Sequence, residues 1–481
     1  MFSSRIRSFL SARFRLLLAS LQQSDSLPFS EALGEEQIQA VCDAQGASSS
    51  EDDQDEQVFT VAMTLWGFLS QVLHKEQHRS CLAAVARIGV LLVAMGRPRC
   101  AQNSGPYCRA RGRLPVGIVE QLVLDVAAQC EETAPAGWLW KGRHVRMGDG
   151  TSVTMPDTEA NQKAYPQQTC QKEGLGFPIA RMMVLLSLAT AMVSGMAIGP
   201  FAGKETGELA LLRELLDQFD PNDIFLADKL FCCYFMIALL VERKVDLVTL
   251  LHQARKVDRR RGKRLGKHDH LITWQRPDRP SWMDVETYQR MPESLELRLV
   301  HVHIDEPGFR TQSLDIVTTL TDAQEYPRNE IADLYRRRWL VELDIRAIKS
   351  TMGMDHLRCR TPEMVRKEIW TCLLAYNLIR QKLLQAALAM NVPPREMSFT
   401  NALQTFTAAW MVMPLLDRQT QQSLLDAELK SMATQRVGKR PGRVEPRAVK
   451  RRPKPYRLLT MAREAAQALL RKGIDPYKKQ K

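Results

Sequence analysis

Residues 334–349 read LYRRRWLVELDIRAIK, within a helix that we predict over residues 327–350 with Pro327 at its start. At about 100° per residue, Asp344 falls on the side of this helix opposite to four polar residues that share one narrow face. These four are Tyr335, Arg338, Glu342 and Lys349. The geometry therefore selects Glu342 rather than Asp344 as the candidate functional acid. A solvated face with an i,i+4 ion pair between Arg338 and Glu342 is the alternative interpretation.

Two aspartates upstream of this helix follow predicted strands. Asp149 comes directly after a short strand that we predict over residues 144–147, and the glycines on both sides of it let a backbone or a metal ion approach closely. Asp228 follows an apolar strand predicted over residues 223–227, and α/β sheets place their chemistry at the ends of central strands. Taken singly, each aspartate could instead be a helix N-cap or a turn residue.

The three acids together suit a site for two metal ions. Asp and Glu supply the hard oxygen ligands that two divalent cations about 4 Å apart require. Such a pair of ions activates water or a 3′-hydroxyl and stabilises the leaving oxygen during in-line attack at phosphorus. Lysine and arginine on the same helix would hold phosphates, and Tyr335 could donate a hydrogen bond to one. We therefore predict a phosphodiester-cleaving site formed by Asp149, Asp228 and Glu342.

Composition favours a globular protein with a polyanionic partner. The chain has 481 residues, 45% of them hydrophobic, and its 67 Lys and Arg against 54 Asp and Glu give a formal net charge of +13. Ten Cys occur without a CxxC pair, which argues against a zinc module and a disulfide scaffold. Residues 182–203 carry no charge, but their internal Gly and Pro fit two buried strands joined by a tight turn better than a membrane helix. We expect a cytoplasmic, nucleoid-associated protein without a membrane segment.

Patterns along the chain predict an α/β architecture with helical ends. Residues 57–140 have a helical pattern, in which we place residues 107–111 in an exposed basic loop. Strands and helices alternate from His144 onward, which is typical of an α/β core. Residues 252–322 combine a basic run with two strand patterns and predict a β-rich insertion. Thr361 before Pro362 predicts the N-cap of a further apolar helix that reaches about residue 390.

The acids and the spaced tetrad are similar to those of a known family. The order Asp149, Asp228, then Tyr335, Arg338, Glu342 and Lys349 resembles the bacterial insertion-sequence DDE transposases that carry a YREK signature. The resemblance runs over about residues 57–456. It implies a ribonuclease-H-like catalytic core with a β-rich insertion between the second aspartate and the glutamate.

The resemblance also implies an activity and its residues. The expected reaction is cut-and-paste excision at terminal inverted repeats, through hairpin ends, followed by strand transfer into target DNA. Asp149, Asp228 and Glu342 would hold two Mg²⁺ ions, for which Mn²⁺ can substitute. Double-stranded DNA would be the partner, at the inverted-repeat ends and at the target, with two copies of the chain acting as a homodimer in a synaptic complex. The expected DNA contacts are Tyr335, Arg338, Lys349, Arg346, Arg259, Arg260, Lys263, Arg451 and Arg452. Some relatives stack a flipped base on an insertion Trp, but we expect ordinary packing for Trp274 and Trp282.

We assign six parts to the chain on these grounds. They are a basic amphipathic helix and acidic linker (1–56), a helical N-terminal domain for DNA end recognition (57–140), the first part of the core (141–251), the β-rich insertion (252–322), the second part of the core with the YREK helix (323–390), and a helical C-terminal region with a basic tail (391–481).

Two other functions remain open from the sequence. A catalytically inactive DNA-binding derivative of such an element would keep the charge without the chemistry. A generic metal nuclease would cut DNA that lacks inverted repeats equally well. The intact set of three acids favours the active transposase over the first alternative.

Overall fold

The fold is that of a computed structural model, which describes residues 59, 61–94, 100, 102–255, 257, 262–303, 313–409, 412, 416–438 and 460–476. The predicted N-terminal segment (1–56) lies outside the described residues, as do Arg259, Arg260, Arg451 and Arg452. Most of the predicted basic tail lies outside them as well.

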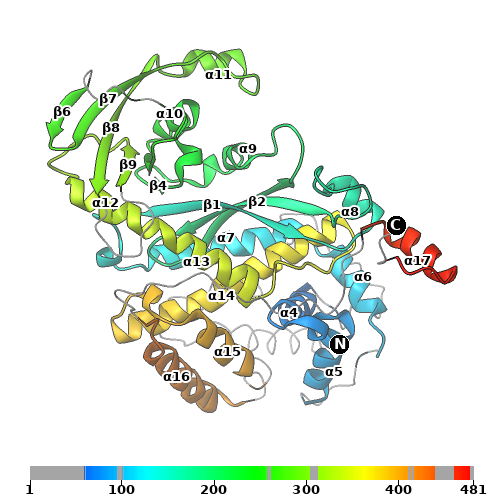
Figure 1. The fold of residues 1–481 in the computed structure, drawn as a ribbon. Helices are drawn as coiled ribbons and strands as arrows, with labels where there is room; N and C mark the ends of the chain where they lie inside the picture. The colour runs from blue at the N-terminus through cyan, green and yellow to red at the C-terminus, as the bar shows by residue number, and fades with distance from the viewer. Residues whose placement is uncertain are drawn as a thin grey trace.

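Among the described residues, nine strands form one mixed sheet that runs through the molecule (Figure 1). Its strands, in the spatial order β3-β2-β1-β4-β5-β9-β8-β7-β6, have these bounds: β1 (Val145–Thr154), β2 (Ile179–Ser187), β3 (Val193–Pro200), β4 (Ile224–Leu226), β5 (Asp246–Leu250), β6 (Lys263–Gly266), β7 (Asp269–Gln275), β8 (Ser294–His303) and β9 (Ser313–Thr318). The alternation of strands and helices from residue 144 is therefore confirmed as a mixed α/β fold.

The pairing of the strands changes along the sheet. β1, β2 and β3 are antiparallel neighbours, whereas β1, β4 and β5 are parallel. β9 then pairs with β5 and continues through β8 and β7 to β6, all antiparallel. The β-rich segment between Asp228 and Glu342 thus extends the same sheet. The expected two-strand arrangement of residues 182–203 is confirmed, with the turn at Leu188–Met192 and Ala191 at φ 63°.

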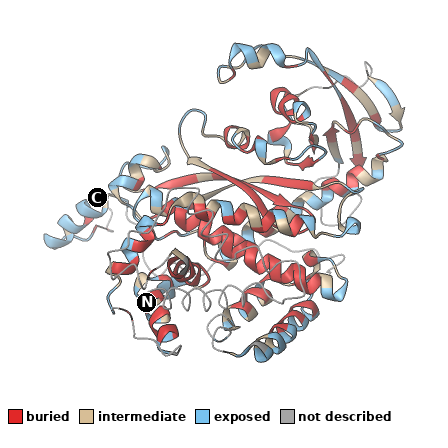
Figure 2. Ribbon diagram, turned by 180° about the vertical axis from the view of Figure 1, so that it is seen from behind, coloured by how far each residue is buried: buried red, intermediate tan, exposed pale blue. Residues whose placement is uncertain are grey.

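Helices cover both faces of the central strands (Figure 1). On one face lie α7 (Val116–Glu132), α13 (Leu340–Arg346) and α14 (Pro362–Met390), and on the other lie α9 (Glu208–Arg213) and α10 (Tyr234–Glu242). α14 begins where the sequence predicted, because the Thr361 hydroxyl accepts a hydrogen bond from the Met364 N–H. Figure 2 shows α14 buried along most of its length, which agrees with its apolar residues on every side.

The remaining helices pack around this core. They are α4 (Val61–Val72), α5 (Cys81–Ala94), α6 (Gly105–Arg113), α8 (Glu159–Ala164), α11 (Val285–Arg290), α12 (Arg328–Arg336), α15 (Phe399–Ala409), α16 (Arg418–Thr434) and α17 (Arg463–Arg471). Both α4 and α7 contact α14, so the N-terminal helices share a hydrophobic core with the rest of the fold. No helix among the described residues is long and apolar enough to span a bilayer.

The expected exposed basic loop at residues 107–111 was wrong. These residues lie in α6, where Tyr107 is fully buried and Arg111 is nearly so. The Gln71 Oε1 accepts hydrogen bonds from the Tyr107 hydroxyl at 2.6 Å and from Arg111 at 2.8 Å. The Arg111 guanidinium also lies 4.3 Å from the centre of the Phe68 ring, so cation–π contact and hydrogen bonding offset the cost of burying its charge.

Candidate active site

Asp149 lies inside β1 rather than after it, which corrects the expectation of a strand ending at residue 147. β1 continues because it pairs with β2 over nine consecutive positions, and Asp149 lies opposite Val184. The glycines serve close packing on the other face of the strand. A Cβ at Gly148 would overlap the Phe225 ring, and a Cβ at Gly150 would overlap the carboxylate of Glu208.

The sheet is open beside Asp149. β4 pairs with β1 only as far as Met147 and Leu226, so among the described residues β1 has no backbone partner on that side from Gly148 to Val153, and a single bridge then pairs Thr154 with His356. Asp228 lies two residues beyond the end of β4, at the same opening. Its carboxylate accepts a hydrogen bond of 2.5 Å from the Leu230 N–H and caps the short 3₁₀ helix Lys229–Phe231. Asp228 is thus a helix N-cap in this structure, which is the alternative role that the sequence left open for it.

The expected single helix over residues 327–350 is instead broken into four segments. α12 is followed by a 3₁₀ turn (Arg337–Trp339), then by α13, and then by a π-helical segment (Ala347–Thr351). A uniform step of 100° per residue does not hold across such changes of helix type. Segments of π-helix occur frequently at functional sites.

The polar residues of these segments still face β1. Arg338 donates a hydrogen bond of 2.8 Å to Glu342, with side-chain exposures of 17% and 35%. The Lys349 ammonium donates to the Ser152 carbonyl of β1 at 2.7 Å. Tyr335 is buried.

Asp344 lies away from this face, as the helical geometry predicted. Its carboxylate is buried and forms ion pairs with Arg380 at 2.7 Å and with Arg395 at 2.9 Å.

Electrostatic coupling joins the acids of this region. Burial raises the pKa of Asp149 to about 6, Arg338 and the Gly150 N–H oppose that rise, and the charges of Glu208 and Glu342 add to it. Burial also raises the pKa of Glu208, with a further contribution from Asp228. Charge repulsion therefore links Asp149 to Glu208 and to Glu342, and Glu208 to Asp228.

The basic and phenolic groups respond to the same environment. Burial raises the pKa of Tyr335 to about 12, with repulsion from Asp228 and Glu342 opposed by Arg338. Burial by itself would lower the pKa of Arg338, but its hydrogen bond to Glu342 gives a net rise. Burial lowers the pKa of Lys349. The site thus combines several acids with two basic side chains, the mostly buried Arg338 and the half-buried Lys349.

A family model described as a transposase DDE domain matches residues 140–378. This segment, just under half of the chain, is therefore similar to a transposase DDE domain. The matched segment includes Asp149, Asp228 and Glu342. Transposase DDE domains generally use divalent metal ions.

Individual relatives agree with this family. The transposase InsG for insertion sequence element IS4 of Escherichia coli (strain K12) is 28% identical over 349 residues, which cover 71% of this chain and 74% of the relative. A putative transposase InsL for insertion sequence element IS186A of the same organism is 38% identical over 80 residues, or 17% of this chain and 20% of the relative. These matches confirm the resemblance to insertion-sequence DDE transposases, while the YREK group stays a prediction.

A solved structure is a more distant match. A piggyBac transposase synaptic complex with hairpin DNA, determined by cryo-EM, has a TM-score of 0.42 and 10% identity, covering 88% of this chain and 84% of that chain. A likeness of this degree supports no further conclusion.

The donor chemistry of this DDE domain fits a divalent cation, but its acids are not assembled as ligands. Among the described residues, no group of three or more His, Cys, Asp or Glu lies close enough to hold a metal ion. Arg338 engages Glu342, and the Leu230 N–H engages Asp228. The carboxylates nevertheless supply hard oxygens, and their mutual repulsion is the property that a bound cation relieves.

The other predicted DNA contacts are scattered. Arg346 is exposed on α13. Lys263 is exposed on β6, the edge strand at the far end of the sheet from β1. The tryptophans of the insertion are packed, since Arg255 lies 4.2 Å from the centre of the Trp274 ring and Arg213 lies 4.0 Å from that of Trp282.

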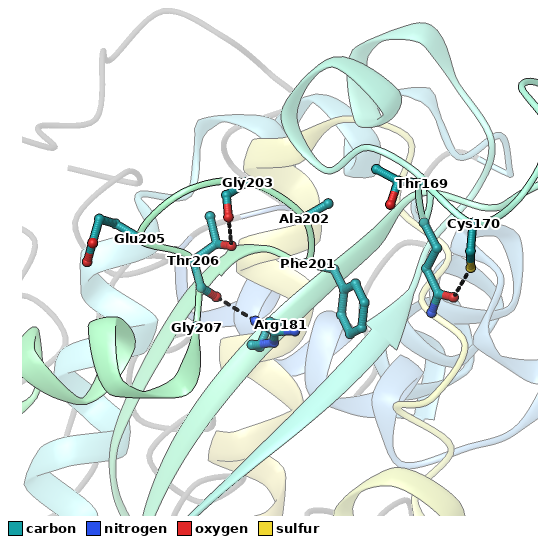
Figure 3. A pocket seen from close by; sticks show the side chains of 10 residues that line it. Thr169, Cys170, Arg181, Phe201, Ala202, Gly203, Glu205, Thr206 and Gly207 are labelled. Carbon is teal, nitrogen blue, oxygen red and sulfur yellow. Dashed lines mark hydrogen bonds between the residues drawn. The ribbon is translucent and has the colours of Figure 1, made fainter. Parts of the chain in front are cut away.

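The sequence prediction missed Glu208, which lies at the start of α9 and next to Gly150. A lone glutamate before an apolar helical turn carries no pattern that marks it as functional. Beside it, the loop before α9 borders an open pocket of about 480 Å³ (Figure 3). In this pocket Arg181 donates to the Thr206 carbonyl at 3.0 Å and lies 4.5 Å from the centre of the Phe201 ring.

Proposed function

We propose that the chain is a metal-dependent DNA transposase that excises an insertion sequence by cut-and-paste at its terminal inverted repeats, through hairpin ends, and transfers its strands into target DNA. One observation carries the proposal. Asp149, Asp228 and Glu342 belong to segments far apart in the chain, yet the charge of Glu342 raises the pKa of Asp149, and the charges of Asp228 and Glu342 both raise that of Tyr335, within the matched segment.

The fold supports a finer architectural proposal. Antiparallel β1 to β3 beside parallel β4 and β5, with helices on both faces, is consistent with a ribonuclease-H-like core. The antiparallel strands β6 to β9 lie between Asp228 and Glu342 in sequence, where the resemblance expects a β-rich insertion. The six predicted parts of the chain remain our assignment.

We assign the roles of the residues by their chemistry. Asp149, Asp228 and Glu342 would hold the divalent ions, Mg²⁺ or Mn²⁺. When bound, these ions activate the attacking oxygen and neutralise the charge that develops on the phosphate. Arg338 and Lys349 would bind DNA phosphates, because charge-assisted hydrogen bonds to phosphate oxygens are strong.

Further contacts would come from outside this cluster. Exposed Arg346 and Lys263 would contact the DNA backbone. The formal charge of +13 supports double-stranded DNA as the partner, both at the ends and at the target. We also propose a homodimer in the synaptic complex, with each copy cutting one end.

A cleavage assay tests the proposal. The full chain is incubated with a plasmid that carries the inverted repeats flanking its gene, with Mg²⁺, with Mn²⁺ or with EDTA, and denaturing gels distinguish nicks, hairpins and joined products. We expect cleavage at the repeats that requires a divalent ion. Replacing Asp149 or Asp228 by Asn, or Glu342 by Gln, should reduce the rate at least about a hundredfold, because the metal contribution amounts to several kcal/mol.

The matched control is Asp333→Asn, since Asp333 is an exposed acid on α12 with a side-chain exposure of 69%. This variant should cleave like the unmodified chain. Persistent cleavage by the three site variants would refute the catalytic assignment. Equal cleavage of DNA without repeats would indicate a generic nuclease, and binding of the ends without cleavage would indicate an inactive derivative.

A further inference from the structure

The helix that carries Glu342 is short and has little buried surface to fix its orientation. α13 has seven residues, of which Val341 and Asp344 are the buried ones, and it lies between a 3₁₀ turn and a π-helical segment. These changes of hydrogen-bonding pattern interrupt the regular helix on both sides. A helix of two turns has little stability of its own and takes its position from tertiary contacts. The contacts of its two buried residues therefore largely determine which way Glu342 points.

Asp344 ties α13 to two arginines that belong to other elements. One carboxylate oxygen pairs with Arg380 of α14 at 2.7 Å, and the other pairs with Arg395, in the 3₁₀ helix Pro394–Glu396, at 2.9 Å. The side chains of Asp344, Arg380 and Arg395 are exposed by only 2%, 7% and 11%. Guanidinium–carboxylate pairs combine charge with a defined geometry. Two such pairs on one carboxylate hold the helix against turning as well as against sliding.

Arg395 connects Asp344 to the strand next to β1. Its guanidinium donates to the carbonyl of Ser187 at 2.6 Å and to that of Leu188 at 2.5 Å, at the end of β2. β2 pairs with β1 along nine consecutive positions, and Asp149 is one of the paired residues. This chain of contacts therefore runs from α13 to the strand that carries Asp149.

Arg380 makes a second connection to the same hairpin. It donates to the Tyr376 hydroxyl at 2.9 Å, and that hydroxyl donates to the Ala191 carbonyl at 3.1 Å. Ala191 lies in the turn that joins β2 and β3. Both arginines thus hold α13 relative to the β2–β3 hairpin, one from within α14 and the other from the segment after it.

Stabilisation of the fold alone explains this ion pair less well. A buried ion pair adds little net stability, because desolvation of the charges offsets most of their attraction. An apolar side chain at residue 344 would bury the same side of α13 without that cost, but a hydrophobic contact has no preferred direction. What the two arginines add is a defined orientation of the helix.

We propose that Asp344 is a positioning residue, which together with Arg380 and Arg395 holds α13 so that Glu342 faces β1. The inference rests on the proposed function, because it concerns the geometry of that reaction. Asp344 and Glu342 are two residues apart and lie on opposite sides of α13, so any turn of the helix moves both. A displacement of about 1 Å at a reacting group can reduce a rate about a hundredfold.

Single-turnover cleavage of inverted-repeat DNA by the full chain tests this role, with DNA and Mg²⁺ in excess. Asp344→Asn keeps the size of the side chain and weakens both ion pairs, and we expect the cleavage rate to fall at least tenfold. The Kd for the DNA ends, measured by gel shift, should change less than twofold, because Asp344 is buried. Asp223→Asn is the matched control, since Asp223 has a side-chain exposure of 4% and pairs with Arg146 at 3.2 Å. This variant should melt earlier but, while folded, cleave at the unmodified rate.

Hydrogen exchange gives a readout that does not need cleavage. Asp344→Asn should accelerate exchange over residues 340–351, whereas Asp223→Asn should not. Arg395→Lys keeps the positive charge, but one ammonium cannot hold the carboxylate and both β2 carbonyls as the guanidinium does. It should give the same pattern with a smaller loss of rate, and it serves as the test where Asp344→Asn does not fold.

The outcomes separate this inference from the proposed function. If folded Asp344→Asn cleaves at the unmodified rate, or if Asp223→Asn loses as much of its rate, the positioning role is refuted and the proposed function stands. A loss of DNA affinity without a loss of rate would refute the role as well. If the unmodified chain does not cleave the repeats, the proposed function fails, and exchange over residues 340–351 still decides the role of Asp344: unchanged exchange there would refute it.

Discussion

Among the buried charged residues of strands β6 to β9, we expect replacement of Arg298 to lower the stability of the fold most. Its side chain is fully buried and forms a two-pronged contact with Asp269, Nε to Oδ1 at 2.8 Å and Nη2 to Oδ2 at 2.6 Å. Its Nη1 also donates to the Tyr326 carbonyl at 2.7 Å. One guanidinium thus ties β7 and β8 to the segment that leads into α12, the helix carrying Tyr335.

Arg298→Met keeps much of the side-chain volume but leaves Asp269 buried without its counter-ion. Removing one member of a buried ion pair costs about 3–5 kcal/mol, because the other charge remains desolvated. We expect a loss of that size in the free energy of unfolding, measured by urea titration. Hydrogen exchange should also accelerate in residues 320–336, because the Tyr326 carbonyl loses its donor.

A double variant distinguishes the ion pair from a packing defect. Adding Asp269→Asn to Arg298→Met removes the stranded charge and should recover part of the lost stability. The control is Arg290→Met, because Arg290 is 56% exposed and its ion pairs with Glu242 and Glu286 are long, at 3.6 and 3.9 Å. We expect a change below about 1 kcal/mol there. A loss below about 1 kcal/mol for Arg298→Met, or no recovery in the double variant, would refute the reasoning.

Three further changes should alter stability in defined directions. Burial raises the pKa of Asp149 from 3.8 to about 6, so ionisation of this carboxyl group lowers the stability of the fold as pH rises through that range. Asp149→Asn should therefore stabilise the metal-free chain by about 3 kcal/mol at pH 7.5 and by about half as much at pH 5. An equal gain at both pH values would contradict this reasoning. Burial lowers the pKa of Lys382 to about 7 and raises that of Glu428 to about 7. Replacing them together by Met and Gln should therefore raise the free energy of unfolding by about 1–4 kcal/mol, measured by urea titration at pH 7. A decrease would show that the pair stabilises the fold. Gly148→Ala should lower the stability of the fold by about 1–3 kcal/mol, because the new methyl group overlaps the Phe225 ring. Gly112→Ala, at an exposed position of α6 with open space around it, should raise stability by up to about 1 kcal/mol. Thermal melts that rank the two variants the other way would contradict the packing argument.

The sequence predicted those features of the fold that depend on residues close together in the chain. Thr361 caps α14 because its hydroxyl accepts a hydrogen bond from the first turn, and Pro362 already has the backbone angle that a helix start requires. The uncharged run at residues 182–203 forms two strands as predicted, but its internal Gly and Pro lie inside β3 and the turn comes before them, at residues 188–192. Asp344 faces away from Glu342 because both belong to α13, where helical geometry holds over two residues.

Tertiary contacts decided the features that the sequence prediction missed. The strand predicted over residues 144–147 ends before Asp149, but β2 pairs with residues 146–154 and keeps the chain extended. Residues 107–111 look exposed because they are basic, yet Gln71 and an aromatic ring satisfy Arg111 inside the core. Glu208 could not be found from spacing, because its relation to Asp149 depends on how α9 packs over the sheet.

The balance of charge at the open edge of β1 is the physical reason to expect cations in the proposed reaction. Asp149 is repelled there by Glu208 and Glu342, and Glu208 by Asp228, while Arg338 favours the charged form of Asp149 and donates a hydrogen bond to Glu342. Arg338 does not offset the burial of Asp149 and its repulsion by Glu208 and Glu342, so the pKa of Asp149 stays raised, at about 6. Additional positive charge at this edge would therefore favour the ionised acids, and the same charge would attract a phosphodiester that the acids alone would repel. The acidic cluster and the formal net charge of +13 are thus compatible under the proposed function: basic residues would attract DNA, and cations bound at the acids would let its backbone approach them.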